Sequence, residues 1–177
     1  MYAIVDVETT GLAAERSKIT DIAIFIHDGK KIVDEFCTLI NPECSIPPRI
    51  TMLTGISDEM VIDAPKFYEV AKEIFLKTEN MIFVAHNAGF DYGMIRAEFK
   101  RLGGAFQRKK LCTVRLSRKM IPGLRSYSLG NLTNSLGIKI TGRHRAEGDA
   151  RATVELFERL LERDKDGFIE KSLNVRS

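Results

Sequence analysis

The stretch YAIVDVETTG, Tyr2 to Gly11, begins as a buried strand and ends with two carboxylates. Residues 3–5 are apolar at consecutive positions, which is typical of a strand with both faces covered. Asp6 and Glu8 follow with one residue between them, so a strand points both side chains to the same face. Two like charges at the end of a buried strand repel each other. The sequence therefore predicts that something positive lies between them.

The composition is that of one ordinary globular domain. The chain has 177 residues, of which 44% are hydrophobic and 29% charged, and a net charge of +3. This charge is too small to indicate a nucleic-acid partner by itself. No run of about 18 apolar residues is present, so no membrane span is expected, and no secretory signal is visible. We expect one domain over residues 1–163, followed by a polar tail or the start of a linker at 164–177.

The three cysteines limit the kinds of metal site that the chain can build. Cys37, Cys44 and Cys112 are odd in number and include no C-x-x-C pair. This spacing supports neither a zinc site nor a disulfide framework, and it favours a reducing, cytoplasmic compartment. Any metal is therefore expected to have oxygen ligands.

Strands and helices alternate along the chain. Residues 19–26 alternate apolar and other side chains like a half-buried strand, and Asp28-Gly29 predicts a hairpin with an antiparallel return strand at 31–40. Further along, apolar runs predict strands at 81–85 and 111–114, and helical periodicity predicts helices that start near 57 and 64 and helices at 90–102, 115–120, 126–136 and 149–163. This order predicts an α/β fold, a mixed sheet of five strands flanked by helices.

Two further acids lie on the packed faces of predicted helices. Asp91 precedes Met94 and Ile95 by three and four residues, so it shares their core-facing side. Asp149 lies in line with Thr153 at the start of the last predicted helix. Each acid taken alone could be a helix cap or a partner of the helix dipole. Four inward acids in one small domain would repel one another, however, and a divalent cation with oxygen ligands, such as Mg²⁺, removes that cost.

One histidine is a candidate acid or base. His144 lies in GRHRAEGDA, residues 142–150, with four residues between it and Asp149. A segment just before a helix is a suitable place for a mobile acid/base beside metals. The alternative is a surface histidine among arginines. His27, at the hairpin turn, is expected to have no special role, and His86 is expected to structure the turn that precedes Asp91.

These motifs together resemble those of the DEDDh 3′–5′ exonucleases. The matching stretches are D-x-E-T-T-G at 6–11, H-N-A-x-F-D at 86–91, and H-x4-D at 144–149. Their order and distances are most similar to those of the proofreading epsilon-type domains of bacterial DNA polymerase III. The segment LTGIS at 53–57 resembles a fourth recurring stretch, although many proofreading subunits carry His where this chain has Thr54.

The resemblance implies a fold, an activity and a set of site residues. The fold is ribonuclease H-like, and Asp6, Glu8, Asp91 and Asp149 gather two divalent ions, Mg²⁺ or Mn²⁺, with Asp6 bridging them and His144 as the general base. The activity is removal of nucleoside 5′-monophosphates from a DNA 3′ end, single-stranded or frayed, in proofreading or DNA repair. The implied or candidate substrate contacts are Thr9, Thr10, Gly11, Leu12, Thr54, Asn87, Phe90, Arg143 and Arg145. For Leu12 and Phe90, core packing is the alternative role.

Other functions remain compatible with the sequence. An exoribonuclease acting on short RNAs or RNA ends would carry the same acids, because the choice depends on how the site treats the 2′-hydroxyl. A binding scaffold that has lost catalysis is a third reading, against which the complete acidic set argues. The expected partners are a DNA polymerase or a fused second nuclease domain.

Overall fold

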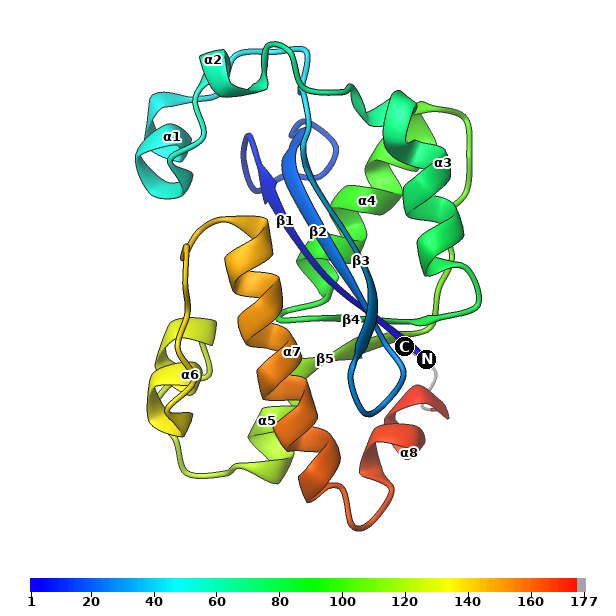
Figure 1. Cartoon of the computed structure of the whole chain (residues 1–177), viewed down its shortest axis with the longest axis vertical. Helices are drawn as coiled ribbons and strands as arrows, with labels where there is room; N and C mark the ends of the chain where they lie inside the picture. Colours follow the sequence, from blue (N-terminus) through cyan, green and yellow to red (C-terminus); the bar gives the residue numbers. More distant parts are fainter. Residues whose placement is uncertain (175–177) are drawn as a thin grey trace.

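Strand β1, Tyr2–Thr9, lies at the centre of the sheet in the computed structural model, which describes residues 1–174 (Figure 1). The sheet has five strands in the order β3-β2-β1-β4-β5. The other strands are β2 (Ile19–His27), β3 (Ile32–Leu39), β4 (Ile82–Ala85) and β5 (Lys110–Cys112). Strands β2 and β3 are antiparallel to their neighbours, whereas β1, β4 and β5 are parallel. The predicted mixed five-stranded α/β fold is confirmed.

Helices cover both faces of this sheet. Alternate β1 residues pack to opposite sides, Ala3 and Val5 with the α3–α4 side and Ile4 with the α7 side. Two short helices, α1 and α2, have a separate small core around Ile56 (Figure 1). The helices are α1 (Pro48–Thr54), α2 (Asp58–Val61), α3 (Phe67–Thr78), α4 (Gly89–Arg101), α5 (Thr113–Met120), α6 (Leu129–Leu136), α7 (Ala146–Arg163) and α8 (Phe168–Asn174).

Strand β2 is more buried than the sequence predicts. The expectation was a half-buried strand, but every residue of β2 is buried, because α7 covers the face that Ala23 and Phe25 present. His27, expected at an exposed turn, is 0% exposed. Its Nδ1 accepts a hydrogen bond from the N–H of Gly29, so Nε2 carries the proton and donates to Glu158 of α7 over 2.9 Å. This histidine therefore joins the hairpin to α7.

The parallel strand β4 places the start of α4 beside the end of β1. Strand β4 pairs with β1 from Tyr2↔Ile82 to Ile4↔Val84, so both strands end at the same edge of the sheet. His86 follows β4 and, as predicted, structures the turn. Its Nε2 donates to the carbonyl of Tyr127 and its Nδ1 lies 2.9 Å from the hydroxyl of Thr113. The first turn of α4 is thereby fixed at this edge.

In the C-terminal half, the bounds of the helices and the structure of the last segment differ from the prediction. Helix α6 begins at Leu129 rather than at 126 and is ended by Gly137 in a left-handed conformation, and α7 begins at Ala146 rather than at 149. The segment expected to be a polar tail contains helix α8, whose Ile169 is 3% exposed in the core beneath α7. Its polar residues face outward, so the periodicity of so short a helix is easily missed. Among the described residues, no helix combines the length and apolar character needed to cross a bilayer.

Gly148, in the first turn of α7, gives a test of how this helix is held. A β-carbon at this position would overlap the carbonyl oxygens of Thr141 and Gly142, so α7 and the preceding loop approach through a bare backbone. Gly148→Ala is expected to lower the free energy of unfolding by about 1–3 kcal/mol, the usual cost of overpacking. Urea denaturation measures this loss.

The matched control is Gly93→Ala in α4, where a β-carbon meets no atom within 4 Å. This change is expected to be neutral or to stabilise by about 0.5–1 kcal/mol, because alanine favours a helix more than glycine does. Equal stabilities of the two variants would contradict the close approach at Gly148.

Candidate active site

Three carboxylates meet where β1 ends and α7 begins. Asp6, Glu8 and Asp149 each offer an oxygen, and these oxygens all lie within 4.8 Å of one another. Asp6 and Glu8 share the face of β1 that packs against α7, as their spacing predicts. Asp149 is in the first turn of α7 and faces them. The structure thus joins two sequence motifs that are far apart in the chain.

The fourth predicted acid lies against this cluster from α4. Asp91 is 3% exposed, and its Oδ1 accepts a hydrogen bond of 3.2 Å from the N–H of Val7, between Asp6 and Glu8 in β1. Its charge is the strongest electrostatic influence on Asp6. The structure therefore brings all four predicted acids to one place, with Asp6, Glu8 and Asp149 as the tightest group.

Burial and mutual repulsion favour the protonated forms of these acids. Burial raises the pKa of Glu8 to about 8, with further increases from Asp149 and Asp21. Burial raises the pKa of Asp91 to about 7, against the lowering effect of its backbone hydrogen bonds. The pKa of Asp6 is raised well above its ordinary value, first by burial and then by Asp91, Glu8 and Asp149. Carboxylates with raised pKa values at one spot are typical of functional sites.

The donor set fits a hard divalent cation. Oxygen ligands from carboxylates are those that Mg²⁺ and Mn²⁺ prefer. One oxygen of Asp149, Oδ1, is buried and has no hydrogen-bond partner among the described residues, whereas a buried carboxylate oxygen normally has one. A bound cation would satisfy this oxygen and would remove the repulsion within the cluster. All three cysteines are free and contribute nothing to this cluster.

His144 is held next to Asp149 by its backbone. Its φ angle is +61°, in the left-handed region that favours glycine, and its N–H donates to Asp149 Oδ2 over 3.1 Å. His144 is half-buried. Burial raises the pKa of Asp149, and the backbone bond from His144 and a charge on its imidazole oppose this increase. The structure therefore places the predicted base beside the acids.

Asp21 is a further acid of this site that was not predicted from the sequence. It faces Glu8 across the β1–β2 pair and is 5% exposed. Its Oδ2 accepts hydrogen bonds from Arg145 Nε at 2.9 Å and from the N–H of Ala146 at 3.3 Å. Asp21 therefore ties β2 to the start of α7 and fixes the loop that carries His144. A single acid within the apolar stretch ITDIAIF was the signal available in the sequence.

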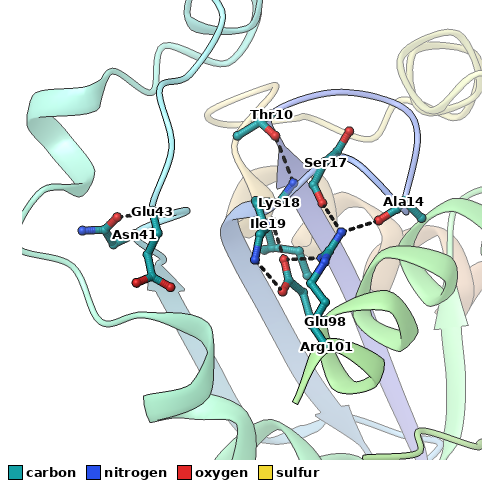
Figure 2. A network of polar contacts seen from close by, with 9 residues as sticks. All are labelled: Thr10, Ala14, Ser17, Lys18, Ile19, Asn41, Glu43, Glu98 and Arg101. Atoms are coloured by element: carbon teal, nitrogen blue, oxygen red, sulfur yellow. Dashed lines mark hydrogen bonds and ion pairs between the residues drawn. The ribbon is translucent and has the colours of Figure 1, made fainter. Parts of the chain in front are cut away.

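The loop after β1 is fixed to α4 by a network of polar contacts (Figure 2). Arg101 donates to the carbonyls of Ala14 and Ser17 at 2.7 and 2.9 Å. Glu98, itself 4% exposed, accepts from the N–H of Ile19 and pairs with Lys18 and Arg101. These contacts hold the base of the loop that contains Thr9, Thr10, Gly11 and Leu12.

The predicted nucleotide contacts within this loop differ in exposure. Thr9 and Thr10 are buried, and their hydroxyls bond to the carbonyl of Gly11 and the N–H of Lys18. A β-carbon at Gly11 would come within 2.9 Å of the Ser17 hydroxyl. Leu12 is 84% exposed, so the core-packing alternative does not apply to it.

The other residues that were predicted to contact the nucleotide lie on separate elements of the fold. Thr54 is buried, and its hydroxyl is bonded to Ile50 and Ile56, so it serves the end of α1. Asn87 is exposed with a φ angle of +70°, and Phe90 is half-buried against the core, as its alternative role predicts. The exposed Arg143 lies against Gly130 of α6. Arg145 pairs with Asp21, so its guanidinium is already engaged.

The fold and the acidic cluster are those predicted for an exonuclease, and comparison with known sequences agrees with this class. A family model described as Exonuclease matches residues 3–157, so this chain belongs to the exonuclease family. The predicted resemblance to the DEDDh exonucleases and to epsilon-type domains is confirmed at this level.

Among individual relatives, the chain is 36% identical over 162 residues to the DNA polymerase III subunit epsilon of Aquifex aeolicus, with 91% of this chain and 80% of that protein covered. It is 39% identical over 162 residues to the PolC-type DNA polymerase III of Caldanaerobacter subterraneus subsp. tengcongensis. There the match covers 92% of this chain but 12% of the polymerase. The chain therefore corresponds to a small part of that relative and to most of the epsilon subunit.

Solved structures share the fold over nearly the whole chain. Exonuclease X, in complex with 5′ overhanging duplex DNA, is 28% identical with a TM-score of 0.77, and the match covers 93% of each chain. Exonuclease I has a TM-score of 0.85 at 18% identity, covering 99% of this chain and 44% of that one. The predicted ribonuclease H-like fold is confirmed.

The raised pKa values predict how the metal-free protein responds to pH. The pKa of Glu8 rises from 4.5 to about 8 on folding, so the folded state holds more protons than the unfolded state between these values. The contribution of Glu8 to the free energy of unfolding is therefore fully present below about pH 4.5 and is lost as the pH rises towards 8. The loss is up to about 1.4 kcal/mol per pH unit for each extra proton that the folded state holds. Unfolding in a chelator across this range measures the slope.

The Glu8→Gln variant is the matched control, because it removes one titrating group and should make the slope shallower, while Asp6 and Asp91 still contribute. Burial lowers the pKa of His86, whose contribution to stability has the opposite sign but is the same in both proteins. The difference between the two slopes therefore reports Glu8 together with its effect on Asp6. Added Mn²⁺ should stabilise the wild type most at the alkaline end. Stability that rises with pH throughout in the chelator would contradict the charge repulsion.

Proposed function

We propose that this protein is a metal-dependent 3′–5′ exonuclease that removes nucleoside 5′-monophosphates from single-stranded or frayed DNA ends. The observation that carries the proposal is the group of three carboxylates within 4.8 Å, one of which has a buried oxygen without a partner. Such a group suits a cation that binds phosphate oxygens. Membership of the exonuclease family supports the reaction class.

Asp6, Glu8, Asp91 and Asp149 would hold two Mg²⁺ or Mn²⁺ ions. When bound, such ions stabilise negative charge on phosphoryl oxygens and make water more acidic. Once deprotonated, the carboxylates contribute the negative charge that retains the cations. Because their protons must leave for a cation to bind, activity should increase as the pH rises towards about 8.

The other residues position the substrate and move a proton. His144 accepts the proton of the attacking water as general base, and the backbone bond to Asp149 sets its place. Asp21 and Arg145 hold the loop of His144 in position. Thr9, Thr10 and Gly11 form a rigid cradle for the terminal nucleotide, with the exposed Leu12 against its base. Asn87 and Phe90, four residues and one residue before Asp91, would border the same nucleotide.

The names of the relatives suggest the biological setting. Relatives named DNA polymerase III epsilon subunit, PolC-type DNA polymerase III and 3′-5′ exonuclease DinG all match this chain. We infer that the protein acts in proofreading or DNA repair, with a DNA polymerase or a linked second nuclease activity as partner. We expect it to act in the cytoplasm, where its three free cysteines remain reduced.

Directionality tests this function. A labelled DNA strand blocked at its 3′ end should resist degradation in Mg²⁺ or Mn²⁺, whereas a 5′ block should make little difference, because the cradle after β1 accommodates a free terminal nucleotide. Asp149→Asn should abolish the release of mononucleotides, since it removes a cation ligand. Product analysis on labelled strands measures both effects.

The same assay with RNA of identical sequence decides between a deoxyribonuclease and an exoribonuclease. Cleavage of a circular single strand at a comparable rate would refute exonuclease action. Activity in EDTA, or full activity of Asp149→Asn, would refute the role of the metal. Binding of strands without any hydrolysis would instead favour the scaffold reading.

His144 is expected to act on the rate and not on metal binding. His144→Ala should lower kcat by about 10²–10⁴-fold, the usual contribution of a positioned acid or base. Its hydrogen bond to Asp149 comes from the backbone, which alanine retains, so Mn²⁺ affinity should change little. Measurements of kcat and of Mn²⁺ binding on the same preparation separate the two effects. Loss of metal binding with the side chain would show that His144 is a ligand.

A further inference from the structure

A basic groove follows the outer strand of the sheet, away from the acidic cluster. It has a volume of about 820 Å³ and extends from the turn at Asn87 past β5 and α5 to Leu173 of α8. Strand β5 is at the edge of the sheet, next to β4. Among the described residues that line the groove, five are basic and none is acidic, namely Arg108, Lys109, Lys110, Arg115 and Arg118. We call this surface the β5 groove.

Four of these basic residues have free charges. Lys109, Lys110, Arg115 and Arg118 are exposed, and none has a carboxylate within 4.0 Å in the part of the chain that the structure describes. Arg108 differs, because its guanidinium donates to the carbonyls of Thr78 and Phe75. Four converging and unneutralised cations repel one another, and a polyanion would relieve this repulsion.

Two of the four cations rest on aromatic rings. The Nζ of Lys110 lies 4.9 Å from the centre of the Tyr92 ring, and the guanidinium carbon of Arg118 lies 5.8 Å from that of Tyr127. Contacts of this kind restrain the side chains without neutralising their charge. The charges are therefore held in place and remain available to a ligand.

The β5 groove begins at the segment after β4, which also carries an acid of the cluster. Strands β1, β4 and β5 are parallel, so their carboxyl ends lie at one edge of the sheet. The end of β1 carries Asp6 and Glu8, and the turn after β4 carries both Asn87 of the groove and Asp91 of the cluster. A polymer that has one end at the acidic cluster can therefore continue along this edge into the groove.

We propose that the β5 groove binds the phosphate backbone of the strand being degraded, several nucleotides from its 3′ end. The inference rests on the proposed function. Free lysine and arginine side chains contact phosphates without reading sequence, which suits an enzyme that must accept any strand. The groove would add affinity for long strands and would leave the chemistry at the terminal phosphate unchanged.

The test compares two fourfold variants of equal net charge. The groove variant carries Lys109→Gln, Lys110→Gln, Arg115→Gln and Arg118→Gln. The control variant carries Lys30→Gln, Lys31→Gln, Lys72→Gln and Lys100→Gln, which neutralises four exposed lysines away from the groove. Each is measured by fluorescence anisotropy with a labelled single strand of about 20 nucleotides, over a range of salt concentrations. Hydrolysis of a small substrate, the p-nitrophenyl ester of thymidine 5′-monophosphate, is measured in parallel.

The groove variant should show a weaker dependence of affinity on salt. Each phosphate contact to a single strand contributes about 0.7 to the slope of log K against log salt, so four lost contacts reduce it by about 2.8. Hydrolysis of the small ester should stay within about twofold of wild type, because the ester is too short to reach the groove. The control variant should keep the wild-type slope.

Equal salt slopes for the groove variant and the control would overturn the proposal, and so would loss of ester hydrolysis in the groove variant. A different outcome would refute the proposed function without refuting the groove. A wild-type protein that hydrolyses neither strand nor ester, yet shows the slope difference, would refute the exonuclease function and uphold the groove.

Discussion

The main constraint on this structure is the repulsion among four carboxyl groups that meet at the end of β1. Asp6 and Glu8 on β1, Asp91 on α4 and Asp149 on α7 would be more stable apart, and their raised pKa values express that cost. Rigid elements on both faces of the sheet hold them together against repulsion. The N–H groups of Val7 and His144 offset part of the charge. The fold thus assembles the four carboxyl groups in advance of any cation, and their protons leave when a cation binds.

The two charged surfaces lie on different strands of the sheet. The acidic cluster lies at the end of β1, and the cations of the β5 groove, which have no carboxylate partner among the described residues, lie along the edge strand β5 and the start of α5. If the proposals hold, a nucleic-acid strand is attracted by the groove and repelled by ionised acids of the cluster unless cations are present. Binding of the strand and readiness for hydrolysis would then depend on different residues.

Local patterns were enough to predict the five strands, most of the helices and the four acids, but not the short helices α1 and α8. The i, i+2 spacing of Asp6 and Glu8 and the helical spacing around Asp91 and Asp149 are short-range signals, and the structure brings these residues together. Contacts between distant residues were not predictable in this way. Asp21 and Arg145 are 124 residues apart, so neither the acid in β2 nor the engagement of the arginine could be read from either neighbourhood. The burial of His27 likewise depends on Glu158 of α7.

Helix α4 sets a fixed distance between two parts of the site. Asp91 lies in its first turn, and Glu98 and Arg101, near its other end, hold the loop after β1. The helical rise sets the spacing from Asp91 to Arg101 at about 15 Å, and a helix hardly stretches. Any tilt of α4 would carry Asp91 and the loop after β1 together, so their separation stays the same. An insertion within α4 would rotate one end against the other, whereas lengthening the segment after it would leave this registration intact.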